Sequence, residues 1–121
     1  MRTMIALLLP MALAVIASAQ TLKSTTYIEP AKSFLLGGGQ PGAFSVKGRN
    51  AGSVPVTVFI ERAGKRDSLV TLAPGANLDA EFPAKAMTVF RNESNGVLAT
   101  LTLTVRGNTS DLGMRYEPAK R

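Results

Sequence analysis

The sequence contains no cysteine, no histidine and no tryptophan. The absence of cysteine excludes disulfides, thiol nucleophiles and thiolate metal sites. The absence of histidine removes the usual base that activates a nucleophile, most zinc ligand sets and the proton shuttle that works near neutral pH. With only two tyrosines as well, the chain lacks the aromatic platforms of many sugar-binding modules. These absences predict a non-enzymatic protein with neither a cofactor nor a bound metal.

The first residues have the pattern of a secretory signal peptide. Arg2 supplies a positive charge before an apolar run that is shorter than a typical transmembrane helix. The run ends in Ala17-Ser18-Ala19, which matches a signal peptidase site and places the mature N-terminus at Gln20. We therefore predict a signal peptide at 1–19, a single domain at 20–121, and a periplasmic or extracellular protein whose mature chain has no transmembrane span.

The balance of charge is basic. Lysine and arginine number 14 against 8 aspartates and glutamates, a net charge of +6 that falls to about +5 if Arg2 is removed with the leader. A domain of about 100 residues can bury a single core. The excess of positive charge either favours an anionic partner or serves solubility.

Period-two alternation of apolar and polar residues dominates the chain after the leader, and helical periodicity is not sustained. The clearest example runs from Val97 to Arg106, where Val97, Ala99, Leu101, Leu103 and Val105 alternate with polar residues, mostly threonine. The segments predicted as strands are 22–28 (weakly alternating), 44–46, 54–61, 68–72, 78–82, 87–91, 97–106 and a last inward row at 112–116. The pattern predicts an all-β fold.

Turn residues separate these segments. Ala73-Pro74-Gly75 has the residues of a β-turn, and Asn95-Gly96 is the strongest short hairpin signal in the chain. The glycine-rich run 36–42 resembles a phosphate loop only in its glycines, and we interpret it as a flexible connector because a strand rather than a helix follows. Strands with this spacing predict a single antiparallel β-sandwich of seven or eight strands, in preference to a barrel.

Part of the chain resembles a known family. Phe44-Ser45-Val46 leads to Asn50-Ala51-Gly52, then to Val56-Thr57-Val58-Phe59 and Leu72-Ala73-Pro74-Gly75. This succession of strand, Asn-x-Gly turn, apolar strand and Leu-x-x-Gly turn resembles the immunoglobulin-like sandwich modules of bacterial surface proteins. It is similar in particular to the cell-adhesion-related domain found in bacteria. The resemblance implies an immunoglobulin-like sandwich and an adhesive role.

Few residues are candidates for chemistry. Asp79 and Glu81 lie two apart in a predicted strand and so share one face, which we interpret as solvated rather than catalytic. The serines have no histidine to activate them and no nucleophile-elbow motif. Phe59, Phe90 and Leu98 either share an exposed apolar side or belong to the core.

The basic residues are predicted to gather at one end of the domain. In an antiparallel fold, successive connections alternate between two ends, so 63–67, 83–86 and 107–111 share one end. Glu61, Asp67 and Asp111 are the acidic residues at that end. The basic residues there are Arg62, Lys65, Arg66, Lys85 and Arg106. They form either a positive patch for a lipid headgroup, wall polymer or nucleic acid, or a surface that keeps the protein soluble.

We predict an exported, non-enzymatic interaction or structural module of the cell envelope or extracellular space, which acts through loops and strand addition at a sheet edge. The expected partner is another envelope or extracellular protein, with an anionic polymer or lipid headgroup as the other option. Nucleic acid is disfavoured because stacking aromatics are few. Two alternatives stay open: a small-ligand carrier or accessory subunit with a cavity between the sheets, and an oligonucleotide-binding-type barrel that binds an anionic polymer.

Overall fold

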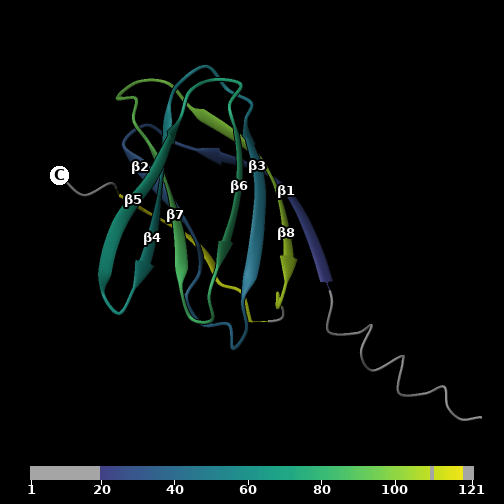
Figure 1. The fold of residues 1–121 in the computed structure, drawn as a ribbon. Helices are drawn as coiled ribbons and strands as arrows, with labels where there is room; N and C mark the ends of the chain where they lie inside the picture. Colours follow the sequence, from purple (N-terminus) through teal and green to yellow (C-terminus); the bar gives the residue numbers. More distant parts are fainter. Residues whose placement is uncertain (1–19, 110, 119–121) are drawn as a thin grey trace, which may run out of the picture.

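In the computed structural model, the described residues are 20–109 and 111–118, and they form nine strands and no helix (Figure 1). The strands are β1 (Gln20–Ile28), β2 (Lys32–Gly37), β3 (Phe44–Asn50), β4 (Val56–Arg62), β5 (Lys65–Leu72), β6 (Asn77–Phe82), β7 (Met87–Asn92), β8 (Ala99–Gly107) and β9 (Met114–Pro118). The predicted signal peptide lies outside the described residues. Within those residues there is no helix that is apolar and long enough to span a membrane.

The strands form two antiparallel sheets. The four-stranded sheet has the order β1-β8-β3-β6, and the five-stranded sheet has the order β5-β4-β7-β2-β9. Neither sheet closes on itself, so the arrangement is consistent with the predicted sandwich, and the alternative of a closed barrel is wrong. The predicted all-β class is confirmed.

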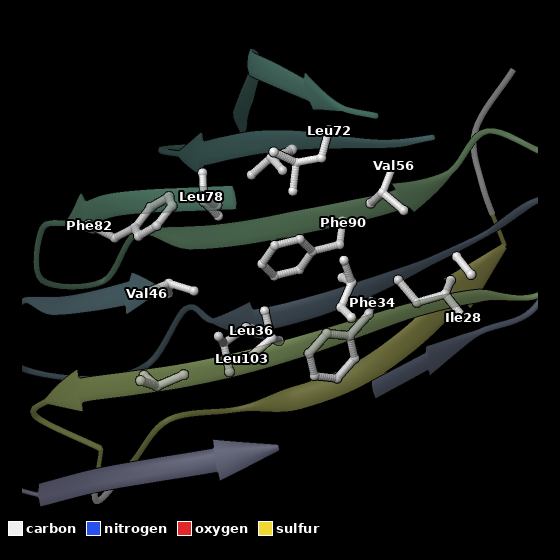
Figure 2. Packing of buried hydrophobic residues seen from close by; sticks show 14 of the residues in the cluster. Ile28, Phe34, Leu36, Val46, Val56, Leu72, Leu78, Phe82, Phe90 and Leu103 are labelled. Carbon is white, nitrogen blue, oxygen red and sulfur yellow. The ribbon is translucent and has the colours of Figure 1, made fainter. Parts of the chain in front are cut away.

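One hydrophobic core takes residues from both sheets. The four-stranded sheet contributes inward residues such as Val46 and Leu101, and the five-stranded sheet contributes Val58 and Phe90, all with no exposed surface. Figure 2 shows Phe90 and other labelled side chains gathered in this core. Burying one such side chain contributes roughly 1.5–3 kcal/mol, so the core must supply the stability that a cysteine-free domain cannot take from disulfides.

The sequence missed one central strand. β2 lies between β7 and β9 in the five-stranded sheet, and Ser33 to Gly37 are all buried. Phe34 and Leu36 belong to the main core, whereas Leu35 packs on the opposite side of the sheet. Because both faces of β2 are covered, its residues do not alternate between apolar and polar, and the signal used to find strands is absent.

In two of the predicted strands, some of the residues expected to face the core are exposed instead. Val97 lies in the connection before β8 and is 45% exposed, although the alternation of β8 extends to it in the sequence. In the last row, Leu112 packs against the core, but Met114 and Tyr116 on β9 are about half exposed (47% and 52%). β9 is an edge strand, so only one neighbouring strand covers it.

The connections alternate between two ends of the molecule, as predicted. We call these ends the upper pole (β1–β2, β3–β4, β5–β6 and β7–β8 connections) and the lower pole (β2–β3, β4–β5, β6–β7 and β8–β9), as they appear in Figure 1. The tight hairpin is Ala63-Gly64, whose φ angles of 50° and 77° are both left-handed. The hairpin expected at Asn95-Gly96 is wrong, because that segment connects β7 to β8 in the other sheet.

Buried carboxamides hold the connections at both poles. Asn50 and Asn92 lie at the upper pole and Gln40 at the lower pole, each at most 2% exposed. Asn92 Nδ2 donates to the carbonyls of Ile28 and Val97 (2.9 and 2.8 Å), so this one side chain links the end of β1 to the β7–β8 connection. Each carboxamide donates two hydrogen bonds to carbonyl oxygens and accepts one from a backbone N–H. The 36–42 segment, expected to be a flexible connector, is thereby fixed through Gln40.

Candidate functional site

The structure splits the predicted basic residues between the two sheets. Arg62, Lys65 and Arg66 lie beside the β4–β5 hairpin, and Lys85 lies in the β6–β7 connection, all at the lower pole of the molecule. Arg106 is also near this pole, but it lies on the outer face of the four-stranded sheet, paired in register with Ser45 and Thr21. The five residues therefore share one pole without sharing one surface.

Arg66 is already engaged by two carboxylates. Its guanidinium lies 2.6 Å from Glu61 Oε1 and 3.2 Å from Glu117 Oε1. Partial burial lowers the pKa of Arg66, but the hydrogen bonds and charges of the two glutamates outweigh it, so the pKa lies above its ordinary value. Because β5 and β9 are the two edges of the five-stranded sheet, the Arg66–Glu117 contact means that this sheet curls until its outermost strands approach each other.

The curled outer face carries a second apolar cluster. Leu35, Met87 and Val89 are buried there, and Phe59 packs against them. Arg91 places its guanidinium 4.7 Å from the centre of the Phe59 ring, a cation–π contact. Phe59 thus belongs to this cluster and Phe90 to the main core, so the exposed side that they were considered to share with Leu98 does not exist.

A surface pocket of about 380 Å³ lies at the lower pole. Lys85 and Arg115 line it together with Glu61 and Asp111, and Gly37 to Gly39 form part of its wall. The two cations face two carboxylates in the same hollow, so the pocket has no excess charge that would select a ligand of one sign.

A second pocket, of about 410 Å³, lies at the upper pole. Its lining contains both tyrosines of the chain, Tyr27 from β1 and Tyr116 from β9, together with Leu98 from the β7–β8 connection. These three side chains are 45–55% exposed. We call this site the tyrosine pocket. It brings three large, partly apolar side chains from distant parts of the sequence into one solvent-accessible hollow.

An ion pair borders the tyrosine pocket. Lys32 Nζ lies 2.8 Å from Glu29 Oε1, and both side chains line the hollow. The hydrogen bond from Lys32, together with its positive charge, lowers the pKa of Glu29 below its ordinary value. The pocket therefore offers an ammonium donor and a carboxylate acceptor beside aromatic and aliphatic surface, a combination that suits an amphipathic ligand.

The backbone around the tyrosine pocket is held at several points. The β1–β2 turn is closed by a hydrogen bond from Lys32 N to Glu29 O (3.1 Å), and Ala31 N donates to Ser94 O in the β7–β8 connection (3.1 Å). The ring of Tyr116 lies 5.2 Å from that of buried Phe34, so the core supports it from behind. A pocket built on supported elements loses less conformational entropy when it binds.

The other candidate residues lie on β6 and in the β7–β8 connection. Asp79 and Glu81 are exposed on the same face of edge strand β6, which confirms that they share one side. Ser94 uses its hydroxyl to accept hydrogen bonds from the backbone N–H groups of Gly96 and Val97. Among the described residues, no group of three or more acidic, cysteine or histidine side chains could hold a metal ion.

Sequence reasoning did not single out the tyrosine pocket. Tyr27 and Tyr116 are far apart in the chain, and no local motif links them to Leu98. They meet because β1 and β9 are edge strands on the same side of the two sheets, which is a property of strand order. No protein-family model matches this chain, and no curated protein sequence matches it either.

Proposed function

We propose that this protein is an exported, non-enzymatic binding module that recognises another envelope or extracellular protein through the tyrosine pocket. The observation that supports this function is the gathering of both tyrosines of the chain, with Leu98, in one exposed hollow. Tyrosine is enriched in protein interfaces because it offers a large rigid surface and a polar tip at little entropic cost. Exposed apolar groups gathered in one place are typical of interaction sites.

The neighbouring strand edge gives the pocket a mode of recognition. β9 contributes Tyr116 to the pocket, and its far side has no partner strand among the described residues. An extended segment of a partner can pair with such an edge through backbone hydrogen bonds, while one of its side chains enters a pocket. We propose that a partner segment adds to β9 in this way and places an apolar or aromatic side chain between Tyr27 and Tyr116.

The immunoglobulin-like character of the fold is part of the same proposal. Immunoglobulin domains pair strand B with E in one sheet and C with F in the other, with C′ beside C. Here β3 pairs with β6, β4 pairs with β7, and β5 pairs with β4, which supports this interpretation for the five consecutive strands β3 to β7. β8 lies beside β3, and β2 lies beside β7. The strands at these positions are therefore connected in a different order from those of an immunoglobulin domain.

Site-specific cross-linking in the native organism tests the proposal. A photoreactive amino acid replaces Leu98 in one strain and Leu69 in another. Leu69 is the matched control, because its exposed fraction is similar to that of Leu98 (48% against 45%). It lies on β5, at the edge of the five-stranded sheet opposite to β9. We expect a discrete cross-linked partner from position 98 alone, lost when Tyr27→Ser and Tyr116→Ser are added. The same adducts from both positions, or adducts that survive the tyrosine changes, would contradict the proposal.

Export is tested on the same strains. Fractionation should recover the protein outside the cytoplasm, and mass spectrometry should place its N-terminus at Gln20. A cytoplasmic protein that keeps Arg2 would contradict export without bearing on the pocket itself.

A further inference from the structure

The two sheets of this protein differ in whether their basic residues form ion pairs. In the described part of the chain, the cations in ion pairs are Lys32, Arg66 and Arg91, and each of them lies on a strand of the five-stranded sheet. The four-stranded sheet also carries basic residues on its outward face, and none of these forms an ion pair with another described residue. Its charge is therefore available to a ligand.

The register of the strands places four cations on this outer face. Lys23 on β1 and Lys47 on β3 lie on either side of Thr104 on β8. Arg49 lies two residues further along β3, and Arg106 two residues further along β8. All four side chains are exposed. With strands about 4.8 Å apart and about 3.4 Å per residue, their Cα atoms fall within an area of roughly 10 by 14 Å.

Hydroxyl groups fill the space between the cations. The other outward residues of β1, β8 and β3 are mostly threonine and serine, namely Thr21, Thr25, Thr100, Thr102, Thr104 and Ser45, and Tyr27 stands at the upper end of β1. The acidic residues of this sheet face, Asp79 and Glu81, are on the edge strand β6, where Asp79 lies opposite Lys47 in register without forming an ion pair and Glu81 lies opposite Ser45. Strands β1, β8 and β3 therefore present a positive, hydroxyl-rich surface with no carboxylate, which we call the cationic face.

We propose that the cationic face binds a linear anionic polysaccharide. Lysine and arginine would pair with its carboxylate, sulfate or phosphate groups, and the threonine hydroxyls would exchange hydrogen bonds with its sugar hydroxyls. A membrane fits less well, because the face has no aliphatic side chain to enter the lipid. Single-stranded nucleic acid fits less well, because Tyr27 is the sole aromatic residue on which a base could stack.

The test measures binding of the purified protein to heparin and to polygalacturonate at several salt concentrations. One variant combines Lys23→Gln, Lys47→Gln and Arg49→Gln. A second, matched in charge, combines Arg62→Gln, Lys65→Gln and Lys85→Gln at the lower pole. We expect the first variant to lose at least tenfold in affinity for both polymers and the second to lose clearly less. The dependence of log Kd on log salt should fall by about one for each contact removed.

Other results would overturn the proposal. Equal losses in both variants would show that only net charge matters, and a larger loss in the second would favour the lower pole. Tighter binding to vesicles containing anionic lipid, or to a thymidine oligonucleotide, would replace the polysaccharide with another class of ligand. Unchanged thermal unfolding of both variants, followed by circular dichroism, ensures that a loss of binding is not a loss of fold. The tyrosine variants of the pocket leave the four cations of the cationic face in place, so either proposal can fail without the other.

Discussion

Replacing Asn92 should weaken the upper pole by an amount that can be worked out from its contacts. Its amide donates to the carbonyls of Ile28 and Val97, its carbonyl accepts from Ser94 N (2.8 Å), and it is 2% exposed. Asn92→Ala leaves these three backbone groups without their partner. A buried polar group without a partner costs about 1–3 kcal/mol. Since the groups nearest the surface can recover water, we expect a loss of about 3 kcal/mol in the free energy of unfolding.

Asn92→Asp adds a pH dependence with a definite sign. The new carboxylate would face two carbonyl oxygens in a buried site, which raises its pKa in the folded state above the unfolded value of about 4. The folded protein then holds a proton that the unfolded chain releases, so stability falls as the pH rises from about 4 towards the folded pKa. The protonated form can still donate to one carbonyl. We therefore expect this variant to be nearest to wild type in acid and weakest at neutral pH.

Urea unfolding at pH 4 and pH 7, followed by circular dichroism, measures both effects. Asn95→Asp is the control, because residue 95 is exposed in the same connection, and its stability relative to wild type should not change with pH. A loss of about 3 kcal/mol lowers the melting temperature of a domain of this size by roughly 12–24 °C. The reasoning is refuted if Asn92→Ala costs less than about 1 kcal/mol, or if Asn92→Asp is as stable relative to wild type at pH 7 as at pH 4.

Three further predictions concern single residues. Gly107→Ala should cost about 2 kcal/mol or more in urea unfolding, because φ is 114° and a Cβ atom would lie 2.7 Å from a backbone oxygen. Gly96→Ala, which meets open space, should change little. Thr88→Val should raise the melting temperature by a few degrees, because the buried Thr88 hydroxyl has no hydrogen-bond partner among the described residues. Lys32→Gln should raise the pKa of Glu29 towards its ordinary value in an NMR titration, and no upward shift would show that Lys32 does not cause the lowering.

The strands with one solvated face were predictable from the sequence. β8 and β6 each alternate buried and exposed residues, which gives the period-two signal directly. β2 gave no such signal, because Phe34 and Leu36 enter one cluster while Leu35 enters another. Val97 was predicted to belong to β8 because the alternation of apolar and polar residues continues through it. In the structure, the Asn92 amide donates a hydrogen bond to the Val97 carbonyl and holds Val97 in the β7–β8 connection. Sequence alternation reports exposure to water, so it gave no signal for β2, whereas β7 was predicted although Met87 to Phe90 are also all buried.

The binding surfaces depend on strand order, which local pattern does not contain. Tyr27 and Tyr116 meet because β1 and β9 are the edges on one side of the two sheets. Lys23 and Lys47 flank one threonine because β8 pairs with both β1 and β3. The predicted basic residues lie near one pole of the molecule, but the sequence pattern could not show that Arg66 is engaged by Glu61 and Glu117.

A comparison of Lys47 with Arg66 tests whether the outer faces of the two sheets have different roles. Both are basic residues on outward faces, but Arg66 joins the two edges of the five-stranded sheet, whereas Lys47 has no ion pair in the described structure. Lys47→Gln should change the free energy of unfolding by less than about 0.5 kcal/mol, and Arg66→Gln should lower it by about 1 kcal/mol. High salt should reduce the difference. Equal stabilities would show that the Arg66 ion pairs contribute nothing to the free energy of unfolding. In that case the cations of the two outer faces would not differ in their contribution to stability.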